Sequence, residues 1–138
     1  MAHPRVLIVE DEALVAMDVE DALTQAGYDV CGVASSEAQA LSMADRTHPQ
    51  FAIVDINLNP GDGRVVARLL RRRHGTAVLF ATGQYDDIRR LDNSGAIACL
   101  PKPYRAEMVP RALRIIDQIS HGDPPGILPD HMFTLGAA

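Results

Sequence analysis

The sequence predicts a doubly wound α/β fold, in which a five-stranded parallel sheet of order 2-1-3-4-5 carries helices on both faces. Two observations lead to this prediction. Short apolar blocks rich in β-branched residues alternate five times with segments whose apolar residues recur at helical spacing. The chain has 138 residues, enough for one domain of ordinary size. A chain of five such rounds most often folds with this strand order.

Each apolar block is predicted to be a strand. The first and third blocks are apolar throughout, as expected for strands whose two faces are both buried. The predicted strands are 6–9, 28–33, 51–54, 77–81 and 96–100.

The segments between and after the strands are predicted to be helices. Gly27 and Gly75 are expected to end the first and third helices as left-handed caps. Ser36 and Gln39 form a capping box that opens the second. Pro110 predicts that the last helix starts late, near Met108, or is bent. The predicted helices are 15–26, 36–46, 64–74, 85–91 and a last one that ends near 120.

Composition argues against several classes of protein. The net charge is −5 with a pI near 5.4, the wrong sign for a protein that binds mainly phosphate backbones. No apolar block approaches the ~20 residues that cross a bilayer, and no cleavable signal precedes the first strand. We therefore expect a cytoplasmic protein without a nucleic-acid or membrane partner. Cys31 and Cys99 lie far apart in apolar contexts, so neither a disulfide nor a thiolate metal site is expected.

Polar residues follow four of the predicted strands at the point where each strand ends. Glu10, Asp11 and Glu12 follow the first, Asp55 the third, Thr82 the fourth and Lys102 the fifth. The carboxyl ends of parallel strands meet at one edge of a doubly wound sheet, which is where such folds bind ligands. Each residue alone has a plainer role, as a helix cap, a turn residue or a surface side chain. Together they predict one site.

The residue types suggest the chemistry of that site. Glu10, Asp11 and Asp55 would bring at least three carboxylates together, and these repel one another unless a cation joins them. Mg²⁺ prefers such oxygen ligands. Asp55 could then act as a nucleophile toward phosphorus, with Lys102 and the Thr82 hydroxyl positioning the phosphoryl group and neutralising its charge.

With these residues in place, the sequence resembles the receiver domain of bacterial two-component response regulators, the CheY-like, flavodoxin-like fold, over residues 6–119. The resemblance implies that a phosphorylated sensor histidine kinase donates its phosphoryl group to Asp55. It implies that Mg²⁺ (or Mn²⁺) is held by Asp11, Asp55 and the backbone carbonyl of Asn57, with Glu10 acting through water. It also implies that Thr82 and Lys102 hold the phosphoryl oxygens. The residues that carry the resemblance are Glu10, Asp11, Asp55, Gly63, Thr82, Lys102 and Pro103, whose bond to Lys102 would be cis.

The sequence departs from the usual pattern at two positions. Glu10 stands where the family usually has Asp, and Cys99 stands where it usually has Tyr or Phe, the aromatic partner of the Thr switch. Residues 79–85 resemble instead the Phe-Ala-Thr-Gly-x-Tyr motif of single-domain receivers that work with HWE-type or related kinases. Tyr85 is a candidate for the missing aromatic, or a packing residue at a helix start.

Two further positions of this motif concern the conformational switch after Thr82 and the lifetime of the phosphoryl group. Gly83 would give the segment after Thr82 extra backbone freedom. Gln84, with Asn57, occupies a position that in the family flanks the phosphoryl group and tunes its hydrolysis.

The resulting hypothesis is a stand-alone receiver domain over 1–121 with a Pro- and Gly-rich tail over 122–138. We expect it to signal by phosphorylation-dependent protein contacts or to act as a phosphate sink, as a monomer or a phosphorylation-dependent homodimer, without turning over an external substrate. The tail is either disordered or a hydrophobic arm docked on this or a second copy.

A haloacid-dehalogenase-like phosphatase is an alternative function, but it normally has an acid at the position of Asn57. A flavodoxin-like small-molecule binder would need a Gly-rich phosphate loop after the first strand.

Overall fold

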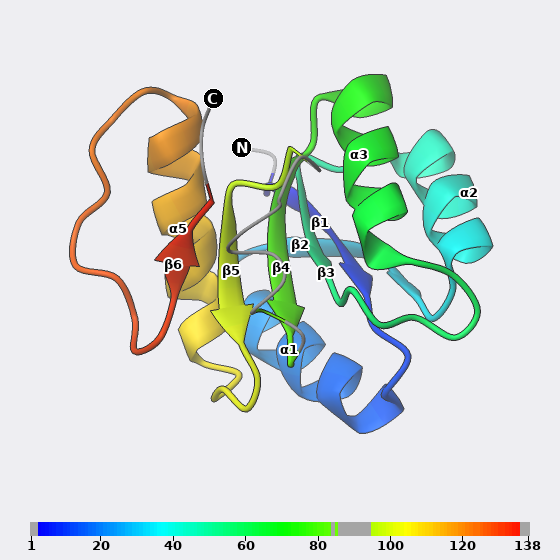
Figure 1. Cartoon of the computed structure of the whole chain (residues 1–138), viewed down its shortest axis with the longest axis horizontal. Helices are drawn as coiled ribbons and strands as arrows, with labels where there is room; N and C mark the ends of the chain where they lie inside the picture. The colour runs from blue at the N-terminus through cyan, green and yellow to red at the C-terminus, as the bar shows by residue number, and fades with distance from the viewer. Residues whose placement is uncertain (1–2, 84, 86–94, 136–138) are drawn as a thin grey trace.

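The chain folds around one mixed sheet of six strands in the order β2-β1-β3-β4-β5-β6 (Figure 1). The computed structural model describes residues 3–83, 85 and 95–135. The first five strands run parallel in the order that the sequence predicts, and β6 is an additional antiparallel strand on β5. The strands are β1 (Arg5–Val9), β2 (Asp29–Ala34), β3 (Phe51–Val54), β4 (Ala77–Thr82), β5 (Ala98–Pro101) and β6 (Phe133–Thr134).

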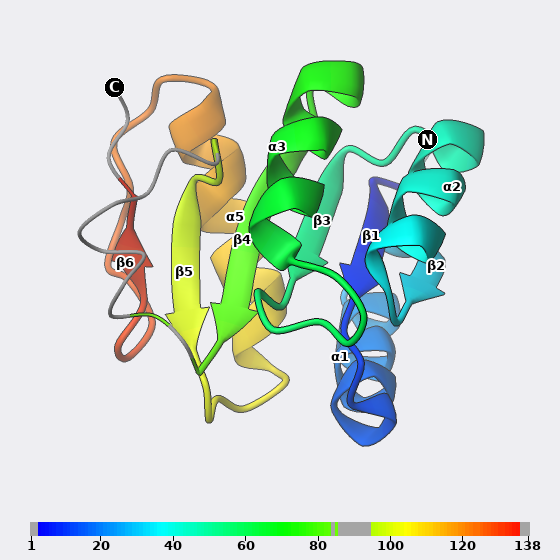
Figure 2. The same cartoon turned by 45° about the vertical axis from the view of Figure 1, so that its right-hand side comes forward.

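Helices cover both faces of the sheet, as a doubly wound fold requires (Figure 2). The helices α1 and α5 pack on one face and α2 and α3 on the other. The bounds are α1 (Ala13–Gln25), α2 (Glu37–Thr47), α3 (Gly63–His74) and α5 (Met108–Ser120). Apart from Tyr85, the predicted helix 85–91 lies outside the described residues.

Alternation along the central strands divides the core into two layers. In β1, Val6 and Ile8 pack beneath α1 and α5, whereas Leu7 and Val9 pack beneath α2 and α3. All four are buried, which explains why this strand is apolar throughout. The described helices include none that is long and apolar enough to span a membrane.

The ends of the helices follow the local signals in the sequence. Ser36 accepts a hydrogen bond from the Gln39 N–H at 3.2 Å, and Gly75 ends α3 with φ of 66°. The helix α5 starts at Met108, so the late start predicted from Pro110 is correct. Pro110 lies in the first turn, where a backbone N–H would have no partner within the helix.

The described part of the C-terminal tail is docked on its own chain. Residues 121–127 are exposed, but Met132 and Leu135 are buried. The Leu135 N–H donates to the Ile97 carbonyl at 2.9 Å, which continues the pairing of β5 with β6. Of the two alternatives for the tail, the structure therefore shows a docked arm up to residue 135. Cys31 and Cys99 do not form a disulfide with each other.

Two substitutions in this tail should have different effects on stability. Leu135→Ala removes a side chain that is 6% exposed, whereas Ile127→Ala changes one that is 83% exposed. We expect Leu135→Ala to lower the free energy of unfolding by about 2 kcal/mol, the lower end for a buried leucine, because it lies on an edge strand. Ile127→Ala should change it by less than about 0.5 kcal/mol. Urea titrations followed by circular dichroism measure both, and equal effects would show that the tail does not pack as described.

Candidate functional site

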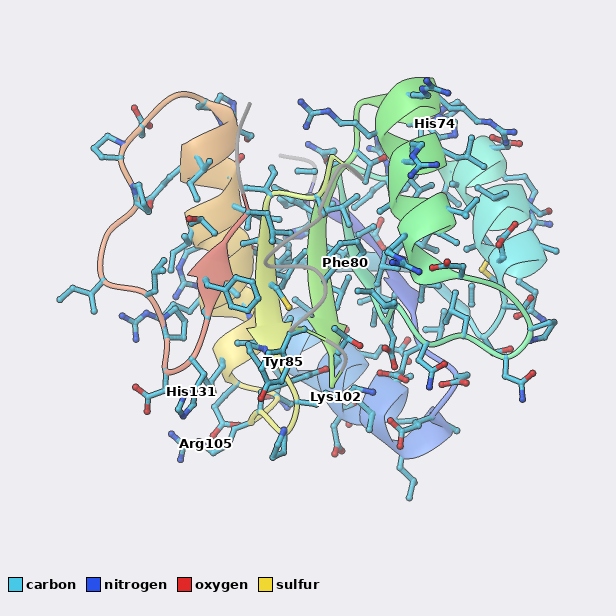
Figure 3. All side chains as sticks on the ribbon, viewed as in Figure 1. His74, Phe80, Tyr85, Lys102, Arg105 and His131 are labelled. Atoms are coloured by element: carbon cyan, nitrogen blue, oxygen red, sulfur yellow. The ribbon has the colours of Figure 1, made fainter. Side chains whose placement is uncertain are left out.

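The carboxyl ends of β1, β3, β4 and β5 bring the predicted polar residues to one end of the sheet. Backbone hydrogen bonds continue one residue beyond the strands. The Asp55 N–H donates to the Val9 carbonyl at 2.9 Å, and the Lys102 N–H donates to the Thr82 carbonyl at 2.9 Å. These bonds set the spacing between the residues that carry the functional side chains. Figure 3 shows Lys102 at the end of the sheet opposite His74, the last residue of α3.

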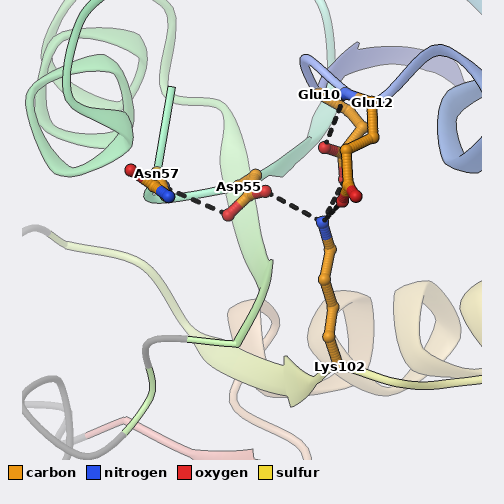
Figure 4. Close-up of polar contacts among 5 residues, drawn as sticks. All are labelled: Glu10, Glu12, Asp55, Asn57 and Lys102. Atoms are coloured by element: carbon orange, nitrogen blue, oxygen red, sulfur yellow. Dashed lines mark hydrogen bonds and ion pairs between the residues drawn. The ribbon is translucent and has the colours of Figure 1, made fainter. Parts of the chain in front are cut away.

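The ammonium group of Lys102 lies at the centre of a carboxylate cluster (Figure 4). Its Nζ atom lies 2.8 Å from Glu10 Oε1, 2.9 Å from Asp55 Oδ2 and 2.7 Å from Glu12 Oε2. The Glu10 and Asp55 side chains are 5% and 7% exposed, so these two pairs are shielded from water. The Glu12 side chain is 61% exposed, and its pair with Lys102 is correspondingly weaker.

Glu12 is a member of this cluster to which the sequence assigned no role in the chemistry of the site. It precedes α1 at the N-cap position, yet its side chain makes no capping hydrogen bond. Its backbone N–H instead donates to Glu10 Oε2 at 3.1 Å, and its carboxylate turns to Lys102. The only signal in the sequence is a third acid after Glu10 and Asp11. That signal does not say whether the side chain faces the site or solvent.

Burial and neighbouring charges shift the pKa values in this cluster. The pKa of Glu10 is raised to about 7, chiefly by burial and further by the Asp55 charge, although hydrogen bonds from Lys102 and the Glu12 N–H oppose the shift. Burial would lower the pKa of Lys102, but hydrogen bonds to Glu10, Glu12 and Asp55 outweigh it and raise that pKa above its usual value. Lys102 therefore stays protonated, and its single positive charge faces several carboxylates.

The donor set fits a hard divalent cation. One carboxylate oxygen from each of Glu10, Asp11 and Asp55 lies within 4.8 Å of the others. Carboxylate oxygens are the ligands that Mg²⁺ takes from proteins, and a second cation would offset the negative charge that Lys102 leaves. The Asn57 N–H donates to Asp55 Oδ1 at 3.1 Å, which places the Asn57 backbone beside this carboxylate.

A cavity of about 370 Å³ opens over the Asp55 carboxylate. It is large enough for a phosphoryl group with a cation and water. Its lining contains Glu12 and most of the residues to which the sequence assigned a role in the site: Asp11, Asp55, Asn57, Thr82, Gly83 and Lys102. Thr82 is fully buried at this lining.

Two predicted switch residues, Cys99 and Tyr85, do not line this cavity. Cys99 is buried in the layer beneath α2 and α3. Tyr85 packs against the same layer and contacts Phe133 of β6. Gln84 lies outside the described residues.

The segment after Lys102 completes this end of the molecule. The Lys102–Pro103 peptide bond is cis. The next residue, Tyr104, packs against the layer beneath α1 and α5, and burial raises its pKa to about 12. Its phenol is therefore neutral at physiological pH.

Gly63 allows the chain to pass close behind Asp55. Its N–H donates to the Ile56 carbonyl at 2.8 Å as α3 begins. A Cβ atom at this position would collide with the Asp55 carbonyl oxygen and the Ile56 Cα, which are backbone atoms. The glycine therefore supports the backbone that carries the Asp55 side chain.

Comparison with known proteins agrees with this geometry. The family model for the response regulator receiver domain matches residues 6–114. The chain belongs to this family. The receiver is 35% identical over 109 residues to the transcriptional regulatory protein PdtaR of Mycobacterium tuberculosis, a match that covers 77% of this chain and 53% of PdtaR. It is 29% identical over 116 residues to the chemotaxis protein CheY of Bacillus subtilis, covering 82% of this chain and 96% of CheY.

Solved structures show the same fold. The signal receiver domain of a modulated diguanylate cyclase from Desulfovibrio desulfuricans is 30% identical, with a TM-score of 0.77 over 88% of this chain and all of that one. The receiver domain of Erythrobacter litoralis PhyR is 22% identical, with a TM-score of 0.72 over 92% of this chain and 98% of that one, and supports the fold alone. The receiver spans about half the length of the first curated relatives that it matches.

Replacing Gly63 should destabilise the receiver. We expect Gly63→Ala to lower the free energy of unfolding by about 1–3 kcal/mol, because the new methyl group must displace backbone. Gly126→Ala is the matched control, since a Cβ there meets nothing within 4 Å. The midpoints of urea unfolding at unchanged slope measure the difference. A Gly63→Ala variant as stable as the control would contradict the close approach.

The acid cluster should bind Mg²⁺ in a manner that depends on Asp11. We expect Asp11→Asn to weaken binding at least about tenfold, the scale seen even for residues that only support a metal ligand. Asp21→Asn on the exposed side of α1 removes the same charge away from the site and is the control. Because the chain has no tryptophan, isothermal titration calorimetry is the suitable measurement. Equal losses in both variants would indicate nonspecific attraction.

Proposed function

We propose that Asp55 accepts a phosphoryl group from a phosphohistidine of a sensor kinase, and that the phosphorylated chain signals by contacts with other proteins or acts as a phosphate sink. The observation that carries the proposal is the Asp55 carboxylate beneath the cavity, with the Lys102 ammonium at 2.9 Å and two further acids within 4.8 Å. Membership of the receiver family supports it.

The transfer forms one bond and breaks another. An oxygen of the Asp55 carboxylate attacks phosphorus as the bond between phosphorus and the kinase imidazole nitrogen breaks, and the electron pair returns to that nitrogen. The product is an aspartyl phosphate. Mg²⁺ or Mn²⁺, held by Asp11, Asp55 and the Asn57 carbonyl with Glu10 nearby, would neutralise negative charge on the phosphoryl oxygens.

Residues of the chain position the phosphoryl group from the opposite side. Lys102 already contacts Asp55, and it can exchange its exposed partner Glu12 for a phosphoryl oxygen at little cost. The Thr82 hydroxyl, at the cavity lining, is a second donor. In this proposal Asp55 is modified and regenerated by hydrolysis, so the chain is a phosphoacceptor rather than an enzyme that turns over an external substrate.

The proposal extends to the class of kinase, the location and the assembly state. The motif over 79–85, with Thr82, Gly83 and Tyr85, supports an HWE-type or related sensor kinase as the donor. The proposal includes a stand-alone receiver in the cytoplasm, either a monomer or a homodimer formed on phosphorylation, and an output partner that is a protein rather than a nucleic acid. The acidic net charge of −5 supports this last point.

Acetyl phosphate with Mg²⁺ should modify the chain once, at Asp55. Intact-mass spectrometry should show a gain of about 80 Da, the mass of one phosphoryl group on the nucleophile. The gain should be lost in Asp55→Ala and kept in Asp62→Ala, which removes an acid at the start of α3 away from the cavity. The same gain in Asp55→Ala would refute the assignment.

A further inference from the structure

A row of side chains crosses the outer edge of the sheet from β4 to β6. The strand register places Phe80 of β4 beside Cys99 of β5, and Cys99 beside Phe133 of β6. All three belong to, or pack against, the core layer beneath α2 and α3, so they share one face of the sheet. Residues paired in this way have Cβ atoms about 5 Å apart. A small thiol at the middle position leaves room for an aromatic ring on each side.

The ring of Phe133 also contacts the segment that leaves the phosphoacceptor site. Tyr85 and Phe133 form an edge-to-face pair with centroids 6.5 Å apart and planes at 62°. Tyr85 follows three residues after Thr82, which lines the cavity over Asp55. Tyr85 and Lys102 lie toward the same end of the sheet (Figure 3). A short stretch of chain therefore joins the cavity lining to the ring that anchors β6.

β6 is a short strand at the edge of the sheet, flanked by the buried side chains of Met132 and Leu135. The strand has two residues, and one hydrogen bond from the Leu135 N–H to the Ile97 carbonyl extends its pairing. The connection from α5 is exposed over 121–127, and Arg111 Nη2 donates to the Ile127 carbonyl at 2.9 Å. Edge elements near a chain terminus open at lower free energy than the central strands of a sheet. Loss of one aromatic pair would shift such an equilibrium about two- to tenfold.

We propose that β6 is a covering strand on the β5 edge whose attachment depends on the state of Asp55. Phosphorylation engages the Thr82 hydroxyl, the chain that follows Thr82 shifts, Tyr85 leaves Phe133, and β6 detaches from β5. In this scheme Phe133 is a positioning residue. Its ring lies beside Cys99, where the family usually has an aromatic side chain of β5, and contacts Tyr85. The inference rests on the proposed phosphorylation of Asp55.

The attachment of β6 and the phosphorylation of Asp55 are then thermodynamically linked. If phosphorylation weakens the attachment of β6, weaker attachment must favour phosphorylation by the same factor. In the Phe133→Ala variant, which loses the ring outside the phosphoacceptor site, the equilibrium of phosphoryl exchange between acetyl phosphate and Asp55 should therefore lie further toward the aspartyl phosphate.

The Leu135 amide reports on β6 because it donates across the β5–β6 pair. Its hydrogen exchange, followed by NMR on the full chain, should become at least several-fold faster after treatment with acetyl phosphate and Mg²⁺. Phe133→Ala should show fast exchange with or without acetyl phosphate. Ile127→Ala, a change at an exposed tail residue, should behave as the wild type does. In Asp55→Ala, acetyl phosphate should leave the Leu135 exchange rate unchanged.

Intact mass, measured on the same samples, separates the two ways in which the scheme could fail. A wild-type chain that gains no phosphoryl group overturns the proposed function, and this inference with it. A chain that gains the group while the Leu135 amide exchanges at an unchanged rate overturns only the control of β6. A Phe133→Ala variant that retains wild-type exchange and its response shows that the Tyr85–Phe133 pair does not carry the coupling.

Discussion

The structure depends most on the electrostatic balance at the carboxyl ends of β1 and β3. Glu10 and Asp55 are buried there, and isolated buried carboxylates are costly. The Lys102 ammonium, within 2.9 Å of both, makes the arrangement tolerable in the folded chain. One ammonium cannot balance all the surrounding acids, so the site retains an affinity for further positive charge. A divalent cation meets that need, because its charge offsets the carboxylates that Lys102 leaves unbalanced.

This balance needs the strand ends to be held rigidly. The parallel pairing of β1, β3, β4 and β5 brings residues that are far apart in sequence, such as Glu10 and Lys102, within contact distance. Backbone bonds past the last strand residues and the close passage of Gly63 behind Asp55 restrict the carboxylate further. A preorganised site of this kind needs little rearrangement when charge arrives, which is how fixed groups stabilise a transferring phosphoryl group.

Much of this could be predicted from the sequence because the signals are local. The apolar run at 6–9 indicates a buried central strand, and Pro110 marks the start of α5. The rule that ligands lie beyond the carboxyl ends of parallel strands then gathers Asp11, Asp55, Thr82 and Lys102 without any knowledge of contacts. The turn of Glu12 toward Lys102 could not be predicted in this way, since an acid before a helix ordinarily caps it.

The strand β6 could not be predicted either, because its position depends on contacts far along the chain. Two residues are too few to show a period of two, and the preceding Pro- and Gly-rich stretch is equally compatible with disorder. Its position is determined by non-local packing, in which Met132 enters one core layer and Leu135 the other. From the sequence alone, Cys99 indicates only that the aromatic residue usual at this position in the family is absent. In the folded chain it is the neighbour of an aromatic ring from β6, so the departure at Cys99 and the docking of the tail are parts of one packing arrangement.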